Sequence, residues 1–339
     1  MQRLVFDGPG AVHWEDAPDP VAGAPGAAIV APLAVATCDL DVAVLAGRYP
    51  LPGPFPFGHE GVAEVVAVGP DVTGVAPGDR VVVPFQISCG ECPPCRRGRT
   101  GNCATHPRMS SYGLGGLGGT GWGGLLADLV AVPHADAMLV PLPAGIDPVV
   151  VASASDNLPD AWRTVGPPLA ADPGADVLVV GGPGGAWSIG LYAAGMAVAL
   201  GAGRVVYVDE DPARLAVAAR LGAEPVEGLP GRRIGSFPVT VDAGGSPDGL
   251  RFALERTARD GVCTSPSIYL QDVPFPLLAM YSRGCTFHTG RVHARPAVPE
   301  VLDLVSRGFD PGAVTVAVAP FADAPAVLAQ PAGKTVFTR

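Results

Sequence analysis

Lysine is almost absent from this sequence, because Lys334 is the only one and nearly all basic side chains are arginine. Charged residues make up 16% of the 339 residues, and the acidic ones dominate to give a formal net charge of −10. That charge argues against nucleic acid or an anionic membrane surface as a partner. Hydrophobic residues reach 48%, yet no apolar run is long enough to span a bilayer. We therefore expect a soluble globular protein of two domains with a large core.

A leader segment is also missing from the first residues, where Asp7-Gly8-Pro9-Gly10 interrupts the apolar start. We therefore expect a cytoplasmic protein whose seven cysteines are reduced. In such a protein, cysteine spacing indicates metal or catalytic chemistry before it indicates disulfide bonds. The 46 glycines and 38 prolines predict many turn-rich loops.

The most specific pattern in the chain is a C-x2-C-x2-C-x7-C run formed by Cys89, Cys92, Cys95 and Cys103. Thiolates at such short spacing can converge on one ion, and the glycines between them let the loop wrap around it. Four thiolates give a closed tetrahedral coordination, which is typical of structural zinc. A ferredoxin-like iron–sulfur run would carry proline after its last cysteine, where this chain has Ala104. We predict a structural zinc lobe at about residues 85–110.

A second set of metal-binding side chains is spread along the N-terminal half. Cys38, followed by Asp39 and Asp41, precedes Gly58-His59-Glu60-Gly61, and an apolar strand over 62–68 comes next. Thiolate, imidazole and carboxylate groups are the ligands that Zn²⁺ takes. A histidine beside a glutamate is on its own also typical of a surface turn, so the pair is informative only together with its neighbours.

The first 150 residues read as β-rich, because short apolar runs alternate with proline and glycine turns. The glycine-laden stretch Met109–Gly124 is either the mobile wall of a substrate pocket or a plain surface loop. Besides strands near residues 4–6, 12–14, 27–30 and 62–68, the pattern predicts a short helix over Cys38–Leu45, a strand at Arg80–Val83, and strand-like segments at Leu125–Val132 and Ala137–Val140.

From about residue 150, strands and helices alternate, which predicts a doubly wound sheet of parallel strands. The expected strands are Asp176–Val180, Arg204–Val208, Val239–Ala243, Val262–Ser265 and Thr286–Thr289. The expected helices are Asp156–Val165, Ser188–Leu200, Pro212–Leu221 and Pro247–Arg259.

The turn after the first of these strands, Gly181-Gly182-Pro183-Gly184-Gly185, is a candidate phosphate-binding loop. Glycines let the backbone approach a pyrophosphate, and the following helix offers N–H groups and its positive dipole end. Asp209 ends the second strand, where a carboxylate can accept from a ribose 2′-hydroxyl. Glu210 and Asp211 beside it would repel a 2′-phosphate, so the pattern favours NAD over NADP.

The glycine pattern departs from G-x-G-x-x-G, because Trp187 stands where the third glycine belongs, and reading from Gly181 puts Pro183 in the middle place. Strand, turn, helix, second strand and acid together still predict dinucleotide binding. The predicted cofactor contacts are Gly181, Gly182, Gly184, Gly185, Ser188, Ile189, Asp209 and Arg214.

Taken together, these motifs resemble the zinc-containing medium-chain alcohol dehydrogenases, in the branch of threonine, polyol and formaldehyde dehydrogenases. The resemblance is carried by Cys38, Gly58-His59-Glu60, Pro77-Gly78-Asp79-Arg80-Val81, the four-cysteine lobe, Ser155-Asp156 ahead of Trp162, and the nucleotide unit ending at Asp209. It implies an α/β protein with a GroES-like β-rich catalytic domain at 1–150 and a Rossmann NAD-binding domain at 151–289. It also implies that residues 290–339 return to the catalytic domain, and that the protein is a homodimer or homotetramer.

The same resemblance implies the roles of the site residues. Cys38, His59 and Asp156 would be ligands of a catalytic zinc, and Glu60 a ligand or near neighbour that exchanges with water or substrate. Asp41 would orient the histidine ligand. Asp156 could instead cap a helix, and Asp41 could be an ordinary exposed helix residue. Together with the structural zinc of the four-cysteine lobe, this catalytic zinc gives two zinc ions per subunit.

Two positions depart from the family pattern. Leu40 stands where the family usually has a serine or threonine whose hydroxyl passes on the substrate proton, and Ala43 offers no imidazole relay. Proton exit would then run through water, Glu60 or Asp39. A milder departure is Ala63, which replaces a usual glycine.

The sequence predicts an NAD-dependent, zinc alcohol dehydrogenase-like enzyme that transfers a hydride between a small alcohol or carbonyl substrate and NAD(H). Two alternatives stay open: a zinc- and NAD-bearing enzyme with non-redox lyase or cyclisation chemistry, and a catalytically idle binding protein. Arg291 and His293 are expected to be solvated surface residues, and Cys263 and Cys285 to be buried thiols on strands.

Overall fold

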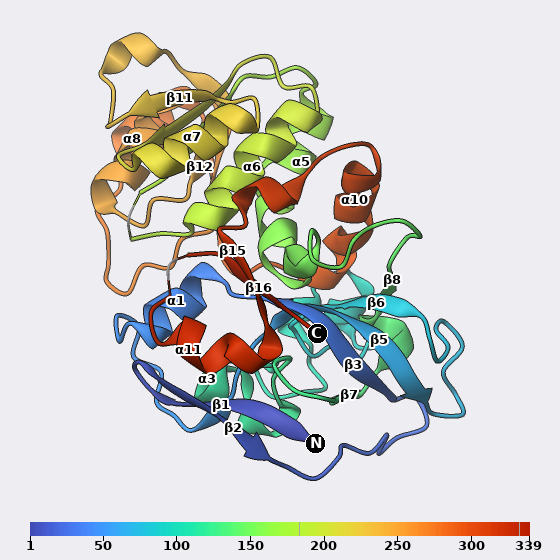
Figure 1. Ribbon diagram of the computed structural model, residues 1–339. Coiled ribbons are helices and arrows are strands. Elements are labelled where there is room, and N and C mark those ends of the chain that lie inside the picture. The colour runs from blue at the N-terminus through green and yellow to red at the C-terminus, as the bar shows by residue number, and fades with distance from the viewer. Residues whose placement is uncertain (183, 332) are drawn as a thin grey trace. The chain divides into compact units, whose positions relative to one another are not determined.

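The computed structural model describes residues 1–182, 184–331 and 333–339, so Pro183 and Ala332 lie outside the described residues. Their contacts divide the chain into two compact units. Unit 1 comprises Met1–Pro159, His293–Ser306 and Thr315–Arg339. Unit 2 comprises Asp160–Val292 and Arg307–Val314. The course of the chain through both can be followed by colour in Figure 1.

Unit 1 is rich in β-structure. Its strands are β1 (Gln2–Gly8), β2 (Ala11–Asp16), β3 (Ala28–Ala36), β4 (Phe55–Pro56), β5 (Glu60–Val68), β6 (Arg80–Val83), β7 (Val130–Val132), β8 (Val140–Pro141), β15 (Ala317–Pro320) and β16 (Thr335–Thr338). A three-stranded sheet has the order β2-β1-β4. A larger sheet has the order β15-β16-β3-β5-β6-β8, with β7 also paired to β3. Phe6 and Phe55, whose ring centroids lie 4.9 Å apart, belong to the buried core of this unit.

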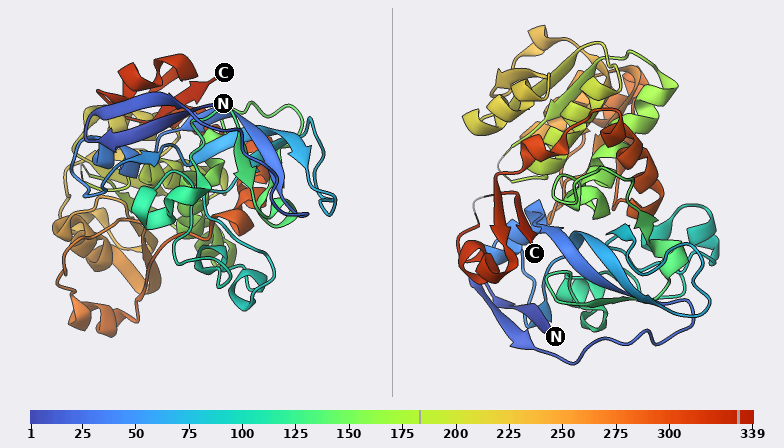
Figure 2. Two further views of the ribbon diagram at one scale, coloured as in Figure 1. Left: turned by 90° about the horizontal axis from the view of Figure 1, so that it is seen from below. Right: turned by 45° about the vertical axis from the view of Figure 1, so that its right-hand side comes forward.

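The register of the larger sheet brings distant parts of the chain to one place. Ala36, the last residue of β3, pairs with Glu60 at the start of β5 and with Val336 near the start of β16. Both pairings are antiparallel. Figure 2 shows the C-terminal strands beside the N-terminal strand β3. The end of β3 and the starts of β5 and β16 therefore lie together at one end of the strands of this sheet.

The helices of unit 1 are short, apart from one at the return of the chain. They are α1 (Asp39–Leu45), α2 (Pro93–Arg96), α3 (Gly115–Gly118), α4 (Ala135–Met138), α10 (Ala294–Ser306) and α11 (Ala324–Leu328), with the 3₁₀ turns η1 (Thr100–Asn102), η2 (Thr120–Trp122), η3 (Ala152–Ser155) and η6 (Phe321–Asp323). Helix α1 begins with a capping box: Cys38 Sγ accepts from the N–H of Leu40 at 3.1 Å, and the Asp41 carboxylate accepts from the N–H of Cys38 at 2.9 Å. This box fixes the backbone around Cys38.

Unit 2 confirms the predicted doubly wound sheet. Its strands are all parallel, in the order β11-β10-β9-β12-β13-β14. They are β9 (Val177–Val180), β10 (Val205–Asp209), β11 (Glu224–Glu227), β12 (Phe237–Asp242), β13 (Thr257–Ser265) and β14 (Thr286–Thr289). The strand order reverses between β9 and β12, and ligands of such sheets bind beyond the carboxyl ends of the strands at this point.

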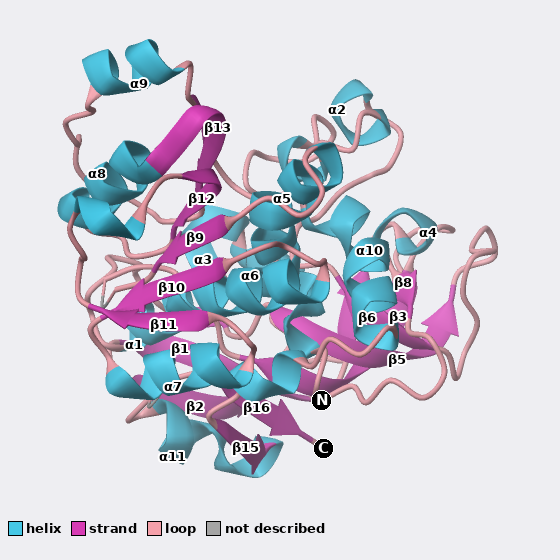
Figure 3. Ribbon diagram, turned by 90° about the horizontal axis from the view of Figure 1, so that it is seen from above, coloured by secondary structure: helices cyan, strands magenta, loops and turns pink. Residues whose placement is uncertain are grey.

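Helices connect these parallel strands. They are α6 (Trp187–Ala199), α7 (Pro212–Arg220), α8 (Pro247–Arg256) and α9 (Leu277–Arg283), with the 3₁₀ turns η4 (Arg232–Ile234) and η5 (Pro311–Val314), while α5 (Asn157–Ala171) starts in unit 1 and continues into unit 2. Figure 3 shows α6 and α8 on opposite sides of the sheet, which explains why β9 is apolar at every position. Among the described residues, no helix is both long and apolar enough to cross a bilayer.

Two predictions about local structure were wrong, and one strand was missed. Residues 137–140 form the end of α4 and the start of β8 rather than one strand. Of Leu125–Val132, only β7 is a strand. Leu125 and Leu126 donate their N–H groups to the carbonyls of Gly58 and Phe57 but form no strand. Strand β11 was missed because its sequence, Glu-Pro-Val-Glu, carries little apolar signal. It lies at the sheet edge, where proline is tolerated.

Candidate metal centres

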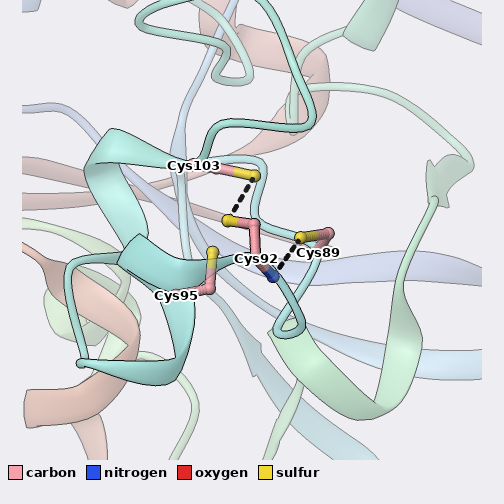
Figure 4. A group of neighbouring side chains, drawn as sticks. All are labelled: Cys89, Cys92, Cys95 and Cys103. Atoms are coloured by element: carbon pink, nitrogen blue, oxygen red, sulfur yellow. Dashed lines mark hydrogen bonds between the residues drawn. The ribbon is translucent and has the colours of Figure 1, made fainter.

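The four cysteines of the predicted lobe converge on one point. Their sulfur atoms lie within 4.8 Å of one another, which is close enough to hold a metal ion, and Figure 4 shows them facing a common centre. Gly90 and Gly98 have φ angles of +76° and +72°, a backbone region that favours glycine and that lets the loop turn back on itself. Four thiols around one point would complete a tetrahedral coordination and leave no position open, which is typical of a structural site.

Hydrogen bonds already favour thiolates in part of this lobe. Bonds from backbone N–H groups, led by that of Ala104 at 3.3 Å, lower the pKa of Cys92 to about 6. Burial opposes the same shift at Cys89, but the Thr105 hydroxyl, at 3.0 Å, holds the pKa of that thiol below its ordinary value. Burial raises the pKa of Cys95 to about 12. A dication would supply the charge needed to ionise the remaining thiols.

The second cluster unites Cys38, His59, Glu60 and Asp156, and each offers one donor atom within 4.8 Å of the others. Cys38 caps α1, and His59 and Glu60 stand at the start of β5. Asp156 follows η3, which Ser155 fixes to β5 by accepting from the N–H of Gly61 at 2.7 Å and donating to its carbonyl at 2.8 Å. All four side chains are buried. Thiol, imidazole and two carboxylates are a donor set that suits Zn²⁺.

Asp156 and Asp41 flank the imidazole of His59. One Asp156 oxygen lies 3.4 Å from His59 Nε2, and one Asp41 oxygen lies 3.3 Å from Nδ1. The alternative that Asp41 is an ordinary exposed helix residue is wrong, since only 1% of it is exposed. Its other oxygen accepts from the N–H of Cys38, so one carboxylate fixes two residues of the cluster.

Burial and mutual charge shift the titration of this cluster. Burial raises the pKa of the Cys38 thiol to about 12, against the effect of His59. For His59, burial lowers the pKa, but the charges of Asp41 and Cys38 outweigh it and hold the pKa well above its usual value. Binding of a divalent cation would therefore release protons from this cluster.

Sequence reasoning missed two residues beside this cluster, Lys334 and Asn157. Lys334 Nζ donates to Glu60 Oε2 at 2.8 Å and to Asn157 Oδ1 at 2.7 Å. Burial raises the pKa of Glu60 to about 8, although Lys334 opposes that shift. The other Glu60 oxygen, Oε1, is buried with no hydrogen-bond partner among the described residues, as expected of an atom that a cation would occupy. The signal that could have found Lys334 is its being the only lysine in the chain.

In unit 2, the glycine-rich turn lies at the carboxyl end of β9, where the strand order reverses. A Cβ on Gly185 would stand 2.2 Å from the carbonyl oxygen of Ala243, and one on Gly181 would stand 2.4 Å from an Asp209 oxygen. Close helix–strand packing is the usual task of the third glycine of such turns. Here Gly190 does it, since its Cβ would stand 2.9 Å from that of Ala243. Pro183 lies outside the described residues.

Asp209 is held firmly at the end of β10. Arg214 donates two hydrogen bonds of 2.8 Å to its carboxylate, and the Tyr207 hydroxyl donates a third at 2.9 Å. Burial opposes ionisation, but these donors keep the pKa of Asp209 below its usual value. Ser188 and Ile189 are buried in the first turn of α6, whose cap residue, Ala186, offers no side-chain hydrogen bond. Backbone N–H groups in such a turn have no acceptor within the helix.

Several other expectations can be judged. His293 is not merely solvated, because its Nδ1 accepts from the N–H of Gly101 at 3.1 Å and ties the return segment to the cysteine lobe. Cys263 is buried on β13 as expected, whereas Cys285 is half-buried and precedes β14. Leu40 is half-buried and packs against the core of unit 1.

The glycine-laden stretch 109–124 is not a plain surface loop. A Cβ on Gly113 would stand 2.2 Å from the carbonyl oxygen of Gly58, and one on Gly124 would stand 2.3 Å from that of Phe57. The stretch therefore packs directly against the segment that leads to His59. Larger residues would push that segment, and His59 with it, out of place.

Comparison with known proteins adds independent findings. The family model described as the alcohol dehydrogenase GroES-like domain matches residues 24–144. A relative from Mycobacterium tuberculosis, named a probable zinc-binding alcohol dehydrogenase, is 32% identical over 91% of this chain and 79% of its own length. The glutathione-independent formaldehyde dehydrogenase of Pseudomonas aeruginosa is 34% identical over 65% of this chain and 57% of its own length. The solved alcohol dehydrogenase of Thermus sp. ATN1 covers 100% of this chain, and 99% of it is covered in return, with a TM-score of 0.89 and 29% identity.

Proposed function

From the premise that the chain belongs to the zinc-containing medium-chain alcohol dehydrogenase family, we propose that it transfers a hydride between an alcohol or carbonyl substrate and NAD(H). Zinc-dependent oxidoreductase chemistry on CH–OH groups is common to the relatives and to this chain. The observation that carries the proposal is the convergence of Cys38, His59, Glu60 and Asp156 from separate segments on one buried point. The fold alone does not determine an activity, which has to be argued from the residues of the site. Here the four donor side chains support zinc-dependent chemistry.

We assign two zinc ions to each chain. One would be held by Cys89, Cys92, Cys95 and Cys103, and the other by Cys38, His59 and Asp156, with Glu60 as a fourth ligand or exchanging neighbour. When bound, zinc supplies Lewis acidity that polarises the substrate oxygen, and the nicotinamide accepts or returns the hydride.

The chain's own residues give this chemistry its geometry. Asp41 accepts from the N–H of Cys38 and lies beside His59 Nδ1, so it holds thiol and imidazole in fixed orientations. The N–H of Leu40 donates to Cys38 Sγ and stabilises negative charge on that sulfur. Leu40 itself has no hydroxyl, so the substrate proton has to leave by water or through Glu60 or Asp39.

NAD rather than NADP is the cofactor that unit 2 suits. We infer that the pyrophosphate would be held by the turn at Gly181–Gly182 and Gly184–Gly185 and by backbone N–H groups at the start of α6. Asp209 is kept ionised beside this turn by Arg214, and a carboxylate there accepts from a ribose hydroxyl and repels a phosphate. We propose that the nucleotide-binding domain spans about residues 151–289, most of which lie in unit 2, and that residues 290–339 return to the catalytic domain.

A homo-oligomer is the assembly that the surface of unit 2 favours. Beside the edge strand β14, a run of large apolar side chains is exposed, and Leu278 and Tyr281 reach 82% and 86% exposure. The run comprises Ile268, Leu270, Phe275, Leu277, Leu278 and Tyr281. An exposed apolar patch next to a sheet edge is typical of an interface, and a second copy of the chain can cover it by two-fold symmetry. Light scattering of the wild type and of the Leu278→Asp variant would test this, with a fall to monomer expected.

The test of the activity is a panel of primary and secondary alcohols and aldehydes, with NAD or NADP, followed at 340 nm. We expect reduced cofactor to form, and kcat/KM with NAD to exceed that with NADP by about tenfold or more, since a buried charge contact contributes that order. Asp209→Asn is the matched variant, and it should lower the ratio of kcat/KM with NAD to kcat/KM with NADP. Turnover of a substrate with no change at 340 nm would contradict hydride transfer and would favour lyase or cyclisation chemistry instead.

A further inference from the structure

The chain's only lysine is buried against the second metal-binding cluster. Lys334 precedes β16, and its side chain is 0% exposed. The pairing of β16 with β3 fixes its position, because Thr37 donates its N–H to the carbonyl of Thr335 at 2.8 Å. A buried ammonium is costly unless it is fully paired. Lys334 donates to Glu60 and Asn157, which lie 274 and 177 residues away from it along the chain.

The hydrogen bonds of Lys334 and Asn157 form one continuous chain between two carboxylates. Lys334 Nζ donates to Glu60 Oε2 at 2.8 Å and to Asn157 Oδ1 at 2.7 Å, and Asn157 Nδ2 donates to Asp156 Oδ2 at 3.2 Å. An ammonium is a donor only, so it requires the oxygen of the Asn157 amide to face it. The amide NH₂ is then directed to Asp156. The orientation of Asn157 is therefore set by Lys334.

We propose that Lys334 and Asn157 are positioning residues for the Cys38–His59–Glu60–Asp156 centre, and that they brace its two carboxylates against each other. Lys334 occupies Glu60 Oε2 and leaves Oε1 for the ion. Asn157 donates to Asp156 Oδ2, the oxygen that lies 3.4 Å from His59 Nε2. This inference rests on the proposed function, because it takes the cluster to be the second zinc site.

Lys334 also compensates negative charge at the site. Cys38, Glu60, Asp156 and Asp41 can carry four negative charges at this largely buried site, whereas the ion would bring two positive charges. Lys334 supplies a third positive charge at a fixed position. Without it, two of the site's carboxylates lose their brace, and more negative charge remains uncompensated in a buried place.

A role in folding alone predicts something different. Lys334 and Glu60 join two strands of one sheet, so their pair could simply stabilise unit 1. In that case a variant that folds would bind metal as the wild type does. Metal affinity therefore separates a positioning role from a structural one, and the four-cysteine lobe in the same chain serves as an internal reference.

The experiment uses the full chain saturated with Zn²⁺ and three variants: Lys334→Met, Asn157→Leu, and Thr335→Val as a matched control. Thr335 is the buried residue that follows Lys334 at the start of β16, and its hydroxyl donates to the carbonyl of Gly333. Zinc per chain is measured by elemental analysis after dialysis against a series of chelator concentrations. Thermal midpoints are recorded with excess zinc.

We expect the wild type and Thr335→Val to hold two zinc ions per chain over the same chelator range. Lys334→Met should lose one of the two ions at a chelator concentration about 10- to 100-fold lower than the wild type requires, and it should keep the other ion. An effect of this size is typical of removing a partner of a metal ligand. Asn157→Leu should change the same ion in the same direction by a smaller factor. Cobalt added to the emptied second site should give a visible absorption spectrum that differs between the wild type and Asn157→Leu.

Two outcomes would overturn the inference. One is that both variants fold and hold the second ion with wild-type affinity and with an unchanged cobalt spectrum. The other is that Lys334→Met fails to fold while Asn157→Leu binds as the wild type does, because the brace requires both residues. A wild-type chain that holds only the ion of the lobe would instead contradict the proposed function, and so the two failures can be told apart.

Discussion

The two candidate metal centres are assembled in opposite ways. In the lobe, fifteen consecutive residues, from 89 to 103, supply all four donors, and every donor is sulfur. In the other centre, the donors come from three separate segments around Cys38, His59 and Asp156, and they comprise sulfur, nitrogen and oxygen. The first centre needs only its own loop. The second exists only when β3, β5, η3 and β16 are all in register.

This difference separates stability from activity. A closed set of four thiolates leaves no position for a substrate, so its ion can only stabilise the loop. A mixed set that includes an exchangeable carboxylate leaves a position that a substrate oxygen can take. The surrounding residues differ accordingly: backbone N–H groups donate to lobe sulfurs, whereas the side chains of Asp41 and Lys334 hold the donors of the second centre.

The largest effect should follow from breaking the lobe. Cys95→Ser removes one thiolate from a closed site, and the free energy of zinc binding there is folding free energy. We expect the thermal midpoint to fall by about 10 °C or more, as a loss of several kcal/mol does in a chain of this size. Scanning calorimetry with excess zinc measures it. An unchanged midpoint together with an unchanged zinc content would contradict a structural metal.

The second largest effect should follow from breaking the other centre. Cys38→Ser should lower kcat/KM for alcohol oxidation by about 10³-fold or more, because a Lewis acid contributes several kcal/mol to the transition state. The thermal midpoint should move far less than in Cys95→Ser, and zinc should fall from two ions to one. Steady-state kinetics and elemental analysis check both. If the two variants lost activity and stability alike, the division of roles would be wrong.

The titration of the thiols sharpens the same comparison in protein stripped of metal. Because a thiol becomes a reactive thiolate as the pH rises through its pKa, Cys92, with a pKa of about 6, should react with iodoacetamide from slightly acidic pH upward. Cys38, with a pKa of about 12 and a buried sulfur, should stay unlabelled at pH 8. Mass spectrometry of labelled peptides gives the rates. In urea the two should label alike, and equal labelling in the folded chain would refute the distinction.

The smallest of these effects concerns proton transfer at the second centre. Leu40→Thr places a hydroxyl two residues after Cys38, and we expect kcat for alcohol oxidation to rise by about tenfold, short of the usual range for general acid–base catalysis because no imidazole continues the relay at Ala43. Leu40→Val is the matched control, since it has the shape of threonine without the hydroxyl. Initial rates across pH provide the measurement. Equal rates in both variants would mean that the proton leaves by another route.

The features that could be predicted from the sequence are those formed by residues close together in the chain, as in the four-cysteine lobe. Cys89–Cys103 could be read from spacing alone, because a short loop leaves the thiols nowhere else to go. The strands of unit 2 other than β11 were predicted, because continuous apolar runs are typical of parallel sheets. Residues 137–140 were not, since four apolar residues fit a helical turn or a strand equally well.

The parts of the site that escaped prediction depend on long-range register. Lys334 reaches Glu60 only because β16 pairs with β3, and no pattern near residue 334 indicates that pairing. Asn157 gains its role only from the orientation that Lys334 imposes on its amide. The Gly190 packing contact was likewise hidden, because the glycine lies three residues beyond the expected place in the turn.

The burial of the sole lysine has a practical consequence. Reagents that acylate or cross-link lysine side chains find no exposed lysine in the folded protein, since Lys334 is the only lysine in the sequence and its side chain is 0% exposed. Modification of Lys334 can then occur only when β16 separates from β3, so its rate counts openings of the catalytic sheet. The chain thus carries, at a single position that needs no mutation, a built-in probe for the separation of β16 from β3.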